Sequence, residues 1–541
     1  MGKIIGIDLG TTFCCVSYRD ELGIIRTIDS RDGGTTTPSI VYFDPNGNNA
    51  IVGVTARQEG AMHPEYLVER IKNRMCTPGY VLSMNGQDYS PAAVSSLILS
   101  WIIRDAEEKF GDEDIEGAVI TVPAYFPESG RQATRLAGEN VVLKNGKKLK
   151  VLAILDEPVA ASIAYGNSVH EDVHKTALIY DLGGGTFDCT VMRFDFEGDN
   201  KNLDMITTNG DHNLGGKDWD SALSDYVVSE FCARTGEDVY SMKSDPETIA
   251  WLSENIERAK IVLTARDSTS LSPSYNGKRE KIEITREKFE ELTSSLLDKT
   301  ILLINDMMAE KGLSMESDID EIIMVGSSTK MPQVQNRLEA EYGKSVKSYE
   351  PEKAVAMGAA LVASSIKEDG KDGKDDDKKG GVNGGNKGPL VIRGEDGGVI
   401  KLETKCTMSY GLVALDHGTE VVANIIFKDT EKPAAETRGF VTNVPDQREL
   451  KLRVFENNSL KKNATLDESE EIYESCIVEL TPGLPHKAPI DITFSIDRDG
   501  ILTITALDVT NGISKTVIPQ RKGGDDNTAG MDAANNLELP F

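Results

Sequence analysis

Several features that define common protein classes are missing from this 541-residue chain. It has no uninterrupted apolar run of about 18 residues or more, so the sequence predicts no membrane-spanning helix. Its 59 lysines and arginines are outnumbered by 88 aspartates and glutamates, and the net charge of -29 would repel the phosphates of a nucleic acid. The opening Met-Gly-Lys-Ile-Ile-Gly enters a strand pattern at once and shows no signal peptide. We therefore expect a cytoplasmic protein with neither nucleic acid nor membrane as a partner.

Cysteine patterns with a recognised chemistry are also missing. The seven cysteines are scattered along the chain, and no Cys-x-x-Cys pair indicates a zinc site or a redox dithiol. Small apolar residues in a protein core are the simplest role for such cysteines. Because isolated thiols are typical of reducing compartments, this pattern agrees with the expected location.

Two short stretches share one pattern and indicate phosphate binding. Residues 5–13 read IGIDLGTTF, and residues 179–188 read IYDLGGGTFD. Each passes from an apolar strand into Asp-Leu-Gly and then through small residues to an aromatic. Glycine turns let backbone N–H groups approach a phosphate closely, because no β-carbon intervenes. Asp8 and Asp181 supply hard oxygens suited to Mg²⁺ through its waters. Either stretch alone is most simply an ordinary hairpin, but the matched pair predicts a clamp for a polyphosphate.

Composition divides the chain into four segments. Residues 1–366 alternate strand-like and helix-like stretches, which predicts an α/β architecture with two lobes around a cleft. Residues 367–388 contain no aromatic and a single valine, so we expect a flexible polar linker. Residues 389–520 show short strands separated by turn signals, as is typical of an antiparallel β-sandwich. Residues 521–541 form a short tail with an apolar end, and the sequence predicts no role for that end.

A series of longer strings, in this order, resembles the seventy-kilodalton heat-shock chaperones of the DnaK type. They are GIDLGTT, VITVPAYFPESGRQAT, DEPVAASIAYG, YDLGGGTFD, NGDHNLGGKDWD, ENIERAK, ITREKFEELT, VGSSTKMP and EPEKAVAMGAA. The resemblance implies a two-lobed, actin-like α/β ATPase domain followed by an all-β sandwich. It further implies a chaperone for protein folding and the stress response that hydrolyses ATP to ADP and phosphate with Mg²⁺. Extended apolar peptide or unfolded protein, a J-domain co-chaperone and a nucleotide-exchange factor are the implied partners.

The resemblance also assigns roles to single residues of the nucleotide domain. Lys72 would stabilise charge on the transferred phosphoryl group, and Glu157 would orient the attacking water. Asp8 and Asp181 would hold Mg²⁺ through waters, and Thr186 would lie near the γ-phosphate. The nucleotide-binding residues would be Gly10, Thr11, Thr12, Phe13, Gly183, Gly184, Gly185, Gly215, Gly216, Glu257, Lys260, Thr264, Gly326, Ser327, Ser328, Lys330 and Glu352.

Without the family, some of these residues have simpler explanations. A lysine such as Lys72 on a helix surface is usually just solvated. Glu257, Lys260 and Thr264 lie three and four residues apart, and without the family this spacing favours an exposed ion-pair stripe. The family usually has glycine and arginine where this chain has Ser327 and Lys330. Because lysine lacks the planar guanidinium, we expect weaker stacking on adenine.

The second half of the resemblance concerns peptide binding and its control. Pro123 and Arg131 match the residues that couple nucleotide state to the peptide domain. A peptide groove would be formed by Leu415, Val421, Phe440 and Leu450.

This half also departs most from the family. Gly418 and Asn443 replace the apolar arch over the bound peptide, and Leu450 narrows the central pocket. Too few residues follow the β-domain to form a helical lid, and the linker is polar. We therefore expect weak coupling, with peptide stimulating the ATPase less than about fivefold.

Two other functions remain open. A small-molecule kinase of the same superfold would share the nucleotide cleft but has no need of the β-domain. A nucleotide-regulated interaction module would use the β-domain to bind one specific partner, and the missing arch favours this alternative.

Overall fold

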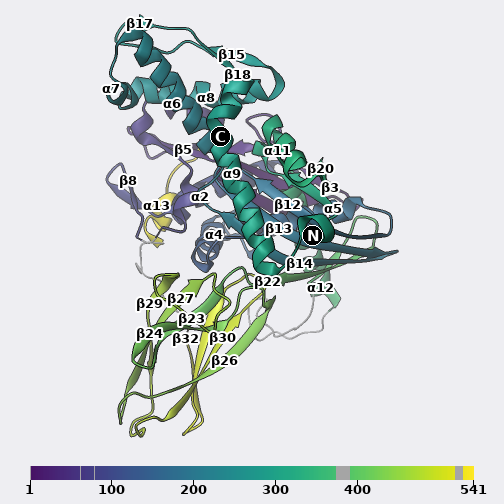
Figure 1. Cartoon of the computed structure of the whole chain (residues 1–541), viewed down its shortest axis with the longest axis vertical. Helices are drawn as coiled ribbons and strands as arrows, with labels where there is room; N and C mark the ends of the chain where they lie inside the picture. Colours follow the sequence, from purple (N-terminus) through teal and green to yellow (C-terminus); the bar gives the residue numbers. More distant parts are fainter. Residues whose placement is uncertain (1, 61, 78, 373–389, 518–527, 541) are drawn as a thin grey trace.

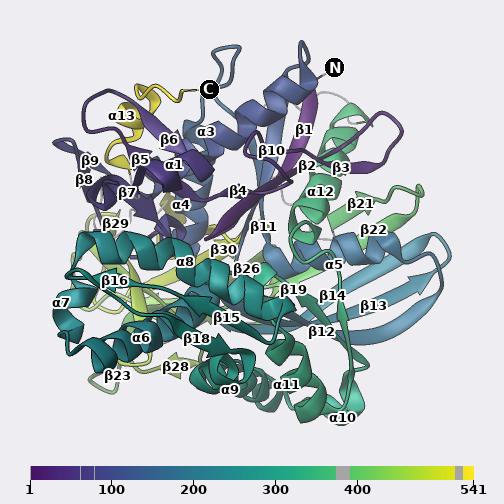
Figure 2. The same cartoon turned by 90° about the horizontal axis from the view of Figure 1, so that it is seen from above.

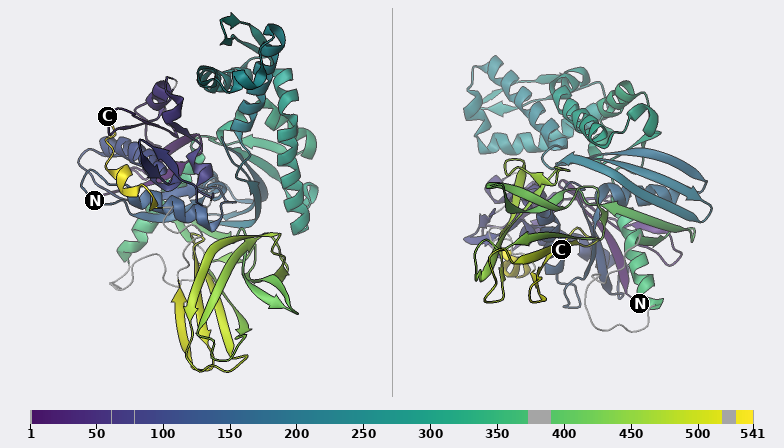
Figure 3. Two further views of the ribbon diagram at one scale, coloured as in Figure 1. Left: turned by 90° about the vertical axis from the view of Figure 1, so that its left-hand side faces the viewer. Right: turned by 60° about the horizontal axis from the view of Figure 1, so that its bottom comes forward.

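The computed structural model describes residues 2–60, 62–77, 79–372, 390–517 and 528–540, with the side chains of 367–372, 474–476 and 517 excepted. Two α/β lobes stand side by side, and a β-domain lies against them at one end (Figures 1 and 3). Among the described helices, none is long and apolar enough to cross a membrane. The predicted fold class, a two-lobed α/β domain followed by a β-sandwich, is confirmed.

Lobe I contains a mixed sheet in which β1 runs parallel to β10 and antiparallel to β2. In spatial order its strands are β11 (Val151–Asp156), β10 (Ile115–Val122), β1 (Lys3–Leu9), β2 (Phe13–Arg19) and β3 (Ile25–Thr27), with β4 (Thr37–Pro38) beside β2. Helices α3 (Pro91–Phe110) and α4 (Glu128–Asn140) cover one face. Helix α3 begins after Ser90, whose hydroxyl accepts a hydrogen bond from Ala93 N at 3.1 Å, a normal N-cap.

Smaller elements complete lobe I. A three-stranded sheet and a two-stranded sheet lie at its outer edge, together with two short helices. They are β6 (Ala50–Val52), β5 (Ile40–Phe43), β7 (Leu67–Glu69), β8 (Leu82–Met84), β9 (Gln87–Tyr89), α1 (Val54–Gly60) and α2 (Ile71–Arg74).

Lobe II repeats the arrangement of lobe I, with β12 parallel to β19 and antiparallel to β13. Its sheet contains, in order, β20 (Ser345–Ser348), β19 (Glu321–Val325), β12 (Val173–Leu182), β13 (Phe187–Glu197), β14 (Asn200–Asp211), β22 (Val399–Lys405) and β21 (Leu390–Arg393). One face carries α6 (Gly216–Thr235), α8 (Pro246–Ala265), α9 (Arg286–Lys311) and α11 (Pro332–Tyr342). Between the two sheets lie α5 (Glu157–Ser168) and α12 (Ala354–Asp372), and they share one core with both (Figure 2).

The predicted boundary between the nucleotide domain and the β-domain needs correction. Helix α12 continues to Asp372, and β21 and β22 extend the sheet of lobe II instead of joining the sandwich. Strand β22 pairs in parallel with β14, and its Ile400 and Leu402 are buried in the core that also holds Leu203. Alternating apolar residues predict a strand but do not say which sheet the strand joins. The rest of the predicted linker, residues 373–388, lies outside the described residues.

The β-domain after Lys405 is the predicted antiparallel sandwich. One sheet contains β28 (Asn463–Ala464), β24 (Thr419–Ile426), β23 (Ser409–Asp416), β27 (Glu449–Asn457) and β29 (Ser469–Glu479). The other contains β26 (Ala434–Val441), β30 (Pro489–Ile496), β31 (Leu502–Asp508) and β32 (Ile513–Val517). The short β25 (Glu431–Lys432) pairs with β22 and so connects this domain to lobe II. Inward-facing apolar side chains of both sheets, such as Leu412 and Phe494, form a single core.

Candidate active site

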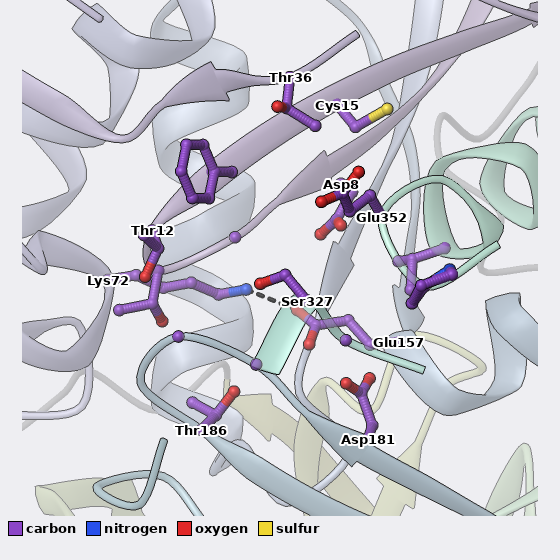
Figure 4. A pocket seen from close by; sticks show the side chains of 18 residues that line it. Asp8, Thr12, Cys15, Thr36, Lys72, Glu157, Asp181, Thr186, Ser327 and Glu352 are labelled. Carbon is purple, nitrogen blue, oxygen red and sulfur yellow. Dashed lines mark hydrogen bonds and ion pairs between the residues drawn. The ribbon is translucent and has the colours of Figure 1, made fainter. Parts of the chain in front are cut away.

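The two glycine hairpins face each other across the cleft between the lobes (Figure 4). They enclose a cavity of about 110 Å³. A β-carbon on Gly184 would lie 1.7 Å from Thr12 Oγ1, so only glycine lets the two loops approach this closely. The buried Thr12 hydroxyl has no hydrogen-bond partner among the described atoms. Such an unsatisfied buried group, between two glycine loops, fits a ligand with hydrogen-bond acceptors such as a phosphate.

A buried ion pair lies at the bottom of this cavity. Lys72, on α2, is 3% exposed and donates to Glu157 Oε1 at 2.6 Å. Burial would lower the pKa of Lys72, but the charges of Glu157 and Asp8 raise it above its ordinary value. The alternative of a solvated surface lysine is therefore wrong. Its position beside the phosphate loops agrees with the role that the family resemblance assigned to it.

The carboxylates around Lys72 outnumber the positive charges near them. Burial first, and then the charge of Glu157, raise the pKa of Asp8 to about 7 and that of Asp188 to about 8. The same causes raise the pKa of Asp181 well above its ordinary value. Lys72 is the one basic side chain among the described residues that line the cavity. This excess of negative charge in a buried place fits a bound divalent cation, because a cation would relieve the mutual repulsion of the carboxylates.

A second cavity of about 220 Å³ continues from the first toward the outside of the cleft. Glu257 in its wall pairs with Arg57 of lobe I at 3.0 Å, so this ion pair crosses the cleft. Lys260 pairs with Asp220 at 2.8 Å. At the rim, Lys330 pairs with Glu352 at 2.5 Å. The carboxylate and ammonium groups are thus present as predicted, but they are already paired with neighbouring side chains.

The structure brings together the residues that sequence analysis selected. The catalytic and metal residues line the first cavity, and the predicted nucleotide-binding residues line one or both cavities, with three exceptions. Gly185, Gly215 and Gly216 pack directly behind the cavity wall, where a β-carbon on Gly215 would lie 2.4 Å from Gly185 N.

Sequence analysis missed several side chains at this site. Arg57 and Lys217 are cations near Glu257, at 3.0 and 3.8 Å. Asn73 donates to the Gly185 carbonyl at 3.1 Å, and Asp188 accepts from Tyr125 N at 3.0 Å. Asp188 closes the string YDLGGGTFD and Lys217 lies within NGDHNLGGKDWD, so both could have been found there, whereas Arg57 and Asn73 stand outside the quoted strings.

A groove in the β-domain contains the four predicted peptide-binding residues. Its volume is about 660 Å³, and Leu415, Val421, Phe440 and Leu450 line it over a floor that includes Ile490. Leu415 is 62% exposed. Asn443 also lines the groove, whereas Gly418 lies in the turn between β23 and β24 with a φ of +87°.

The predicted coupling residues lie where the β-domain meets lobe I. Arg131, on α4, is buried and pairs with Asp156 at 2.6 Å. From the β-domain, Lys432 reaches the same carboxylate at 3.5 Å. Pro123 directly follows Val122, the residue of β10 that pairs in register with Asp156. A buried ion-pair network therefore joins Arg131 to the β-domain without using the polar linker, on which the expectation of weak coupling rested.

Two further contacts hold the β-domain in place. The turn between β30 and β31 inserts Asp499, whose carboxylate pairs with Arg135 of α4 and accepts from Ile154 N at 3.2 Å. On the other lobe, Lys428 pairs with Glu310 at the end of α9 at 2.8 Å. The β-domain thus contacts both lobes.

Fold and site together define a two-lobed phosphate-binding α/β protein with a docked β-sandwich that carries an apolar groove. Comparison with known proteins gives the family. The sequence model described as "Hsp70 protein" matches residues 4–78 and 77–375. Two relatives from different strains of Halobacterium salinarum, each named "Chaperone protein DnaK", are 33% identical over 529 residues, which covers 95% of this chain and 74% of theirs. The chain belongs to the Hsp70 family, and the resemblance seen in the sequence is confirmed.

Proposed function

We propose that this protein is an ATP-dependent chaperone that hydrolyses ATP to ADP and phosphate and binds extended peptide or unfolded protein. The observation that carries the proposal is the buried Lys72–Glu157 pair, 2.6 Å long, placed between two glycine loops. The apolar groove in the docked β-domain supports the chaperone part. The names of the two DnaK relatives agree with it.

Each residue of the cleft has a chemical task in this proposal. When bound, Mg²⁺–ATP supplies the polyphosphate and a divalent positive charge. Asp8 and Asp181 would hold the cation through its waters, and the free hydroxyl of Thr12 would donate to a phosphate oxygen. Lys72 stabilises negative charge that develops on the phosphoryl group, and Glu157 orients the attacking water and holds its proton. Glu257, Lys260, Thr264 and the loop at Gly326 hold the nucleoside.

The proposal extends to partners and location. The similarity to DnaK chaperones leads us to propose a J-domain co-chaperone and a nucleotide-exchange factor as partners. We also propose the cytoplasm as its location. The cysteines whose side chains are described are free thiols, which agrees with a reducing compartment.

ATP turnover with and without a panel of extended apolar peptides tests the proposal. We expect free phosphate as product and saturable peptide binding by fluorescence anisotropy. Leu450→Asp places a charge in the groove and should weaken peptide binding at least about tenfold, because an unpaired charge beside apolar side chains is costly. Leu460→Asp is the matched control, since Leu460 is 49% exposed and does not line the groove.

Two outcomes would replace the proposal with an alternative. A phosphorylated small molecule in place of free phosphate would indicate a kinase. A pull-down that returns one stoichiometric protein, with no peptide binding, would indicate an interaction module for one partner.

A further inference from the structure

The last described part of the chain packs into the core of lobe I. We call residues 528–540 the tail segment; it contains α13 (Met531–Asn535) and lies beside α3, β6 and β9 (Figure 2). Ala534 and Leu539 are 3% and 7% exposed and belong to the same core as α3. Met531, Ala533 and Leu537 are partly buried against the same core, so five apolar side chains of the tail segment stabilise this contact.

Hydrogen bonds fix the tail segment along its whole length. Ser90 N donates to Ala529 O at 2.8 Å near one end. Near the other end, Glu538 N donates to Asn48 O at 2.8 Å, and Ala50 N donates to Glu538 O at 3.0 Å. The tail segment therefore adds to the edge of β6 by backbone pairing. This isolated parallel β-bridge between Asn49 and Glu538 is backbone pairing at a strand edge, which is how extended peptides dock on a sheet.

Two residues show that the surface and the tail segment are fitted to each other. Gly530 has a φ of +72°, and a β-carbon there would lie 2.4 Å from Asp88 O, so no other residue fits well. Asn140, the last residue of α4, is 5% exposed. Its side chain donates to Met531 O at 3.0 Å and accepts from Asn535 at 3.0 Å, so two of the three hydrogen bonds that this side chain makes to described residues depend on the tail segment.

The same helix α4 also receives the β-domain. Arg131 and Arg135 contact the turn that carries Asp499, and Asn140 follows on the same helix. Ten residues, 518–527, join the end of β32 to the tail segment. Even fully extended they span at most about 40 Å, at about 3.6 Å per residue. A docked tail segment therefore limits how far the β-domain can move from lobe I.

We propose that α3, the end of α4 and strands β6 and β9 form a docking site for the tail segment, and that the docked segment is a latch that holds the β-domain on lobe I. This inference goes beyond the proposed function and does not depend on ATP hydrolysis or on the peptide. A short tether gives an effective concentration of about 1 mM. An intrinsic dissociation constant of about 0.1 mM would then keep the latch closed about 90% of the time.

Hydrogen–deuterium exchange on the full chain tests the latch. Leu539→Asp places a charge at the most buried end of the tail segment, and Asn536→Asp places the same charge on an exposed position as a control. Leu539→Asp should speed exchange at least about tenfold at residues 48–50 and also at residues 497–501, where the β-domain touches α4. Asn536→Asp should change neither. Faster exchange at 48–50 alone would overturn the latch, because the tail segment would then only pack against lobe I.

A synthetic peptide of residues 528–541 separates a latch from an effect on folding. Added to the Leu539→Asp chain, it should bind with a dissociation constant below about 1 mM, the effective concentration of the tethered segment. It should restore slow exchange at residues 48–50 but not at 497–501, because it is not joined to the β-domain. Restoration of both, or no binding at 1 mM, would overturn the proposal. If Leu539→Asp unfolds lobe I, the milder Leu539→Ala should give the same pattern with smaller amplitude.

Discussion

Lys72 and Glu157 should contribute to stability as a pair and to hydrolysis separately. Their side chains are 4% and 10% exposed, and they pair at 2.6 Å. Lys72→Met removes one partner and leaves Glu157 beside Asp8 and Asp181 without a cation, which costs about 3–5 kcal/mol. With an unfolding entropy of about 2.1 cal/mol/K per residue, Tm should fall by about 4–6 °C for a unit the size of the two lobes. Lys72→Met/Glu157→Gln restores the net charge of the cluster and should recover most of this loss.

Hydrolysis should behave differently from stability. Each single variant should lose about 10²–10³-fold in single-turnover rate, because charge stabilisation in the transition state is removed, and the double variant should not regain it. Nucleotide affinity, measured by calorimetry, should change much less. Lys330→Met is the control for the stability measurement, because Lys330 is 46% exposed and pairs with Glu352 at the rim of the cleft. The Tm of this variant should fall by less than about 1 °C. A double variant that hydrolyses ATP at the normal rate would refute the roles of both residues.

Three further predictions concern the metal site, pH and coupling. Asp8→Asn and Asp181→Asn should each weaken nucleotide binding at least about tenfold in the presence of Mg²⁺, and equal affinity with and without Mg²⁺ in the natural protein would contradict this. Asp8 and Asp188 have pKa values raised from 3.8 to about 7 and about 8, so the nucleotide-free fold retains protons that the unfolded chain loses. The protonated forms of Asp8 and Asp188 contribute fully to the free energy of unfolding below about pH 4, and this contribution is lost as pH rises through 7 to 8. Tm should therefore fall between about pH 5.5 and 8.5. In Asp188→Asn, Tm should fall less over the same pH range. Arg131→Met should bring the ratio of peptide affinities in the ADP and ATP states to near one, measured by anisotropy; a ratio unchanged from that of the natural protein would exclude the network around Asp156 as the coupling element.

The parts of this protein that could be predicted from sequence are those fixed by local chemistry. The loops of the two Asp-Leu-Gly hairpins nearly touch, so glycine is required there. This requirement appears in the sequence as the repeated Asp-Leu-Gly string. The groove residues came instead from the resemblance to the family, which set the alignment of the β-domain. The burial of Lys72 was not predictable by pattern, because α2 is only a four-residue helix and its surroundings come from both lobes.

The remaining features depend on contacts between distant segments. Strand β22 has an ordinary alternating pattern, and nothing local says that it pairs with β14 instead of a sandwich strand. The expectation of weak coupling assumed an undocked polar linker, whereas the coupling residues meet the β-domain directly at Asp156. The tail segment has too few apolar residues to show a period, so its docking is visible only in three dimensions.

The position of Leu539 has a consequence for biosynthesis. Leu539 is buried in the same core as Ile5, so lobe I contains both early and very late parts of the chain. At about 5–20 residues per second, ribosomes make Leu539 roughly 30–110 s after Ile5. During that interval, the surface that Leu539 later covers is open to other proteins in the cell. Nascent chains of this protein should therefore need protection themselves, and lobe I should become fully protease-resistant only after residue 539 has left the ribosome.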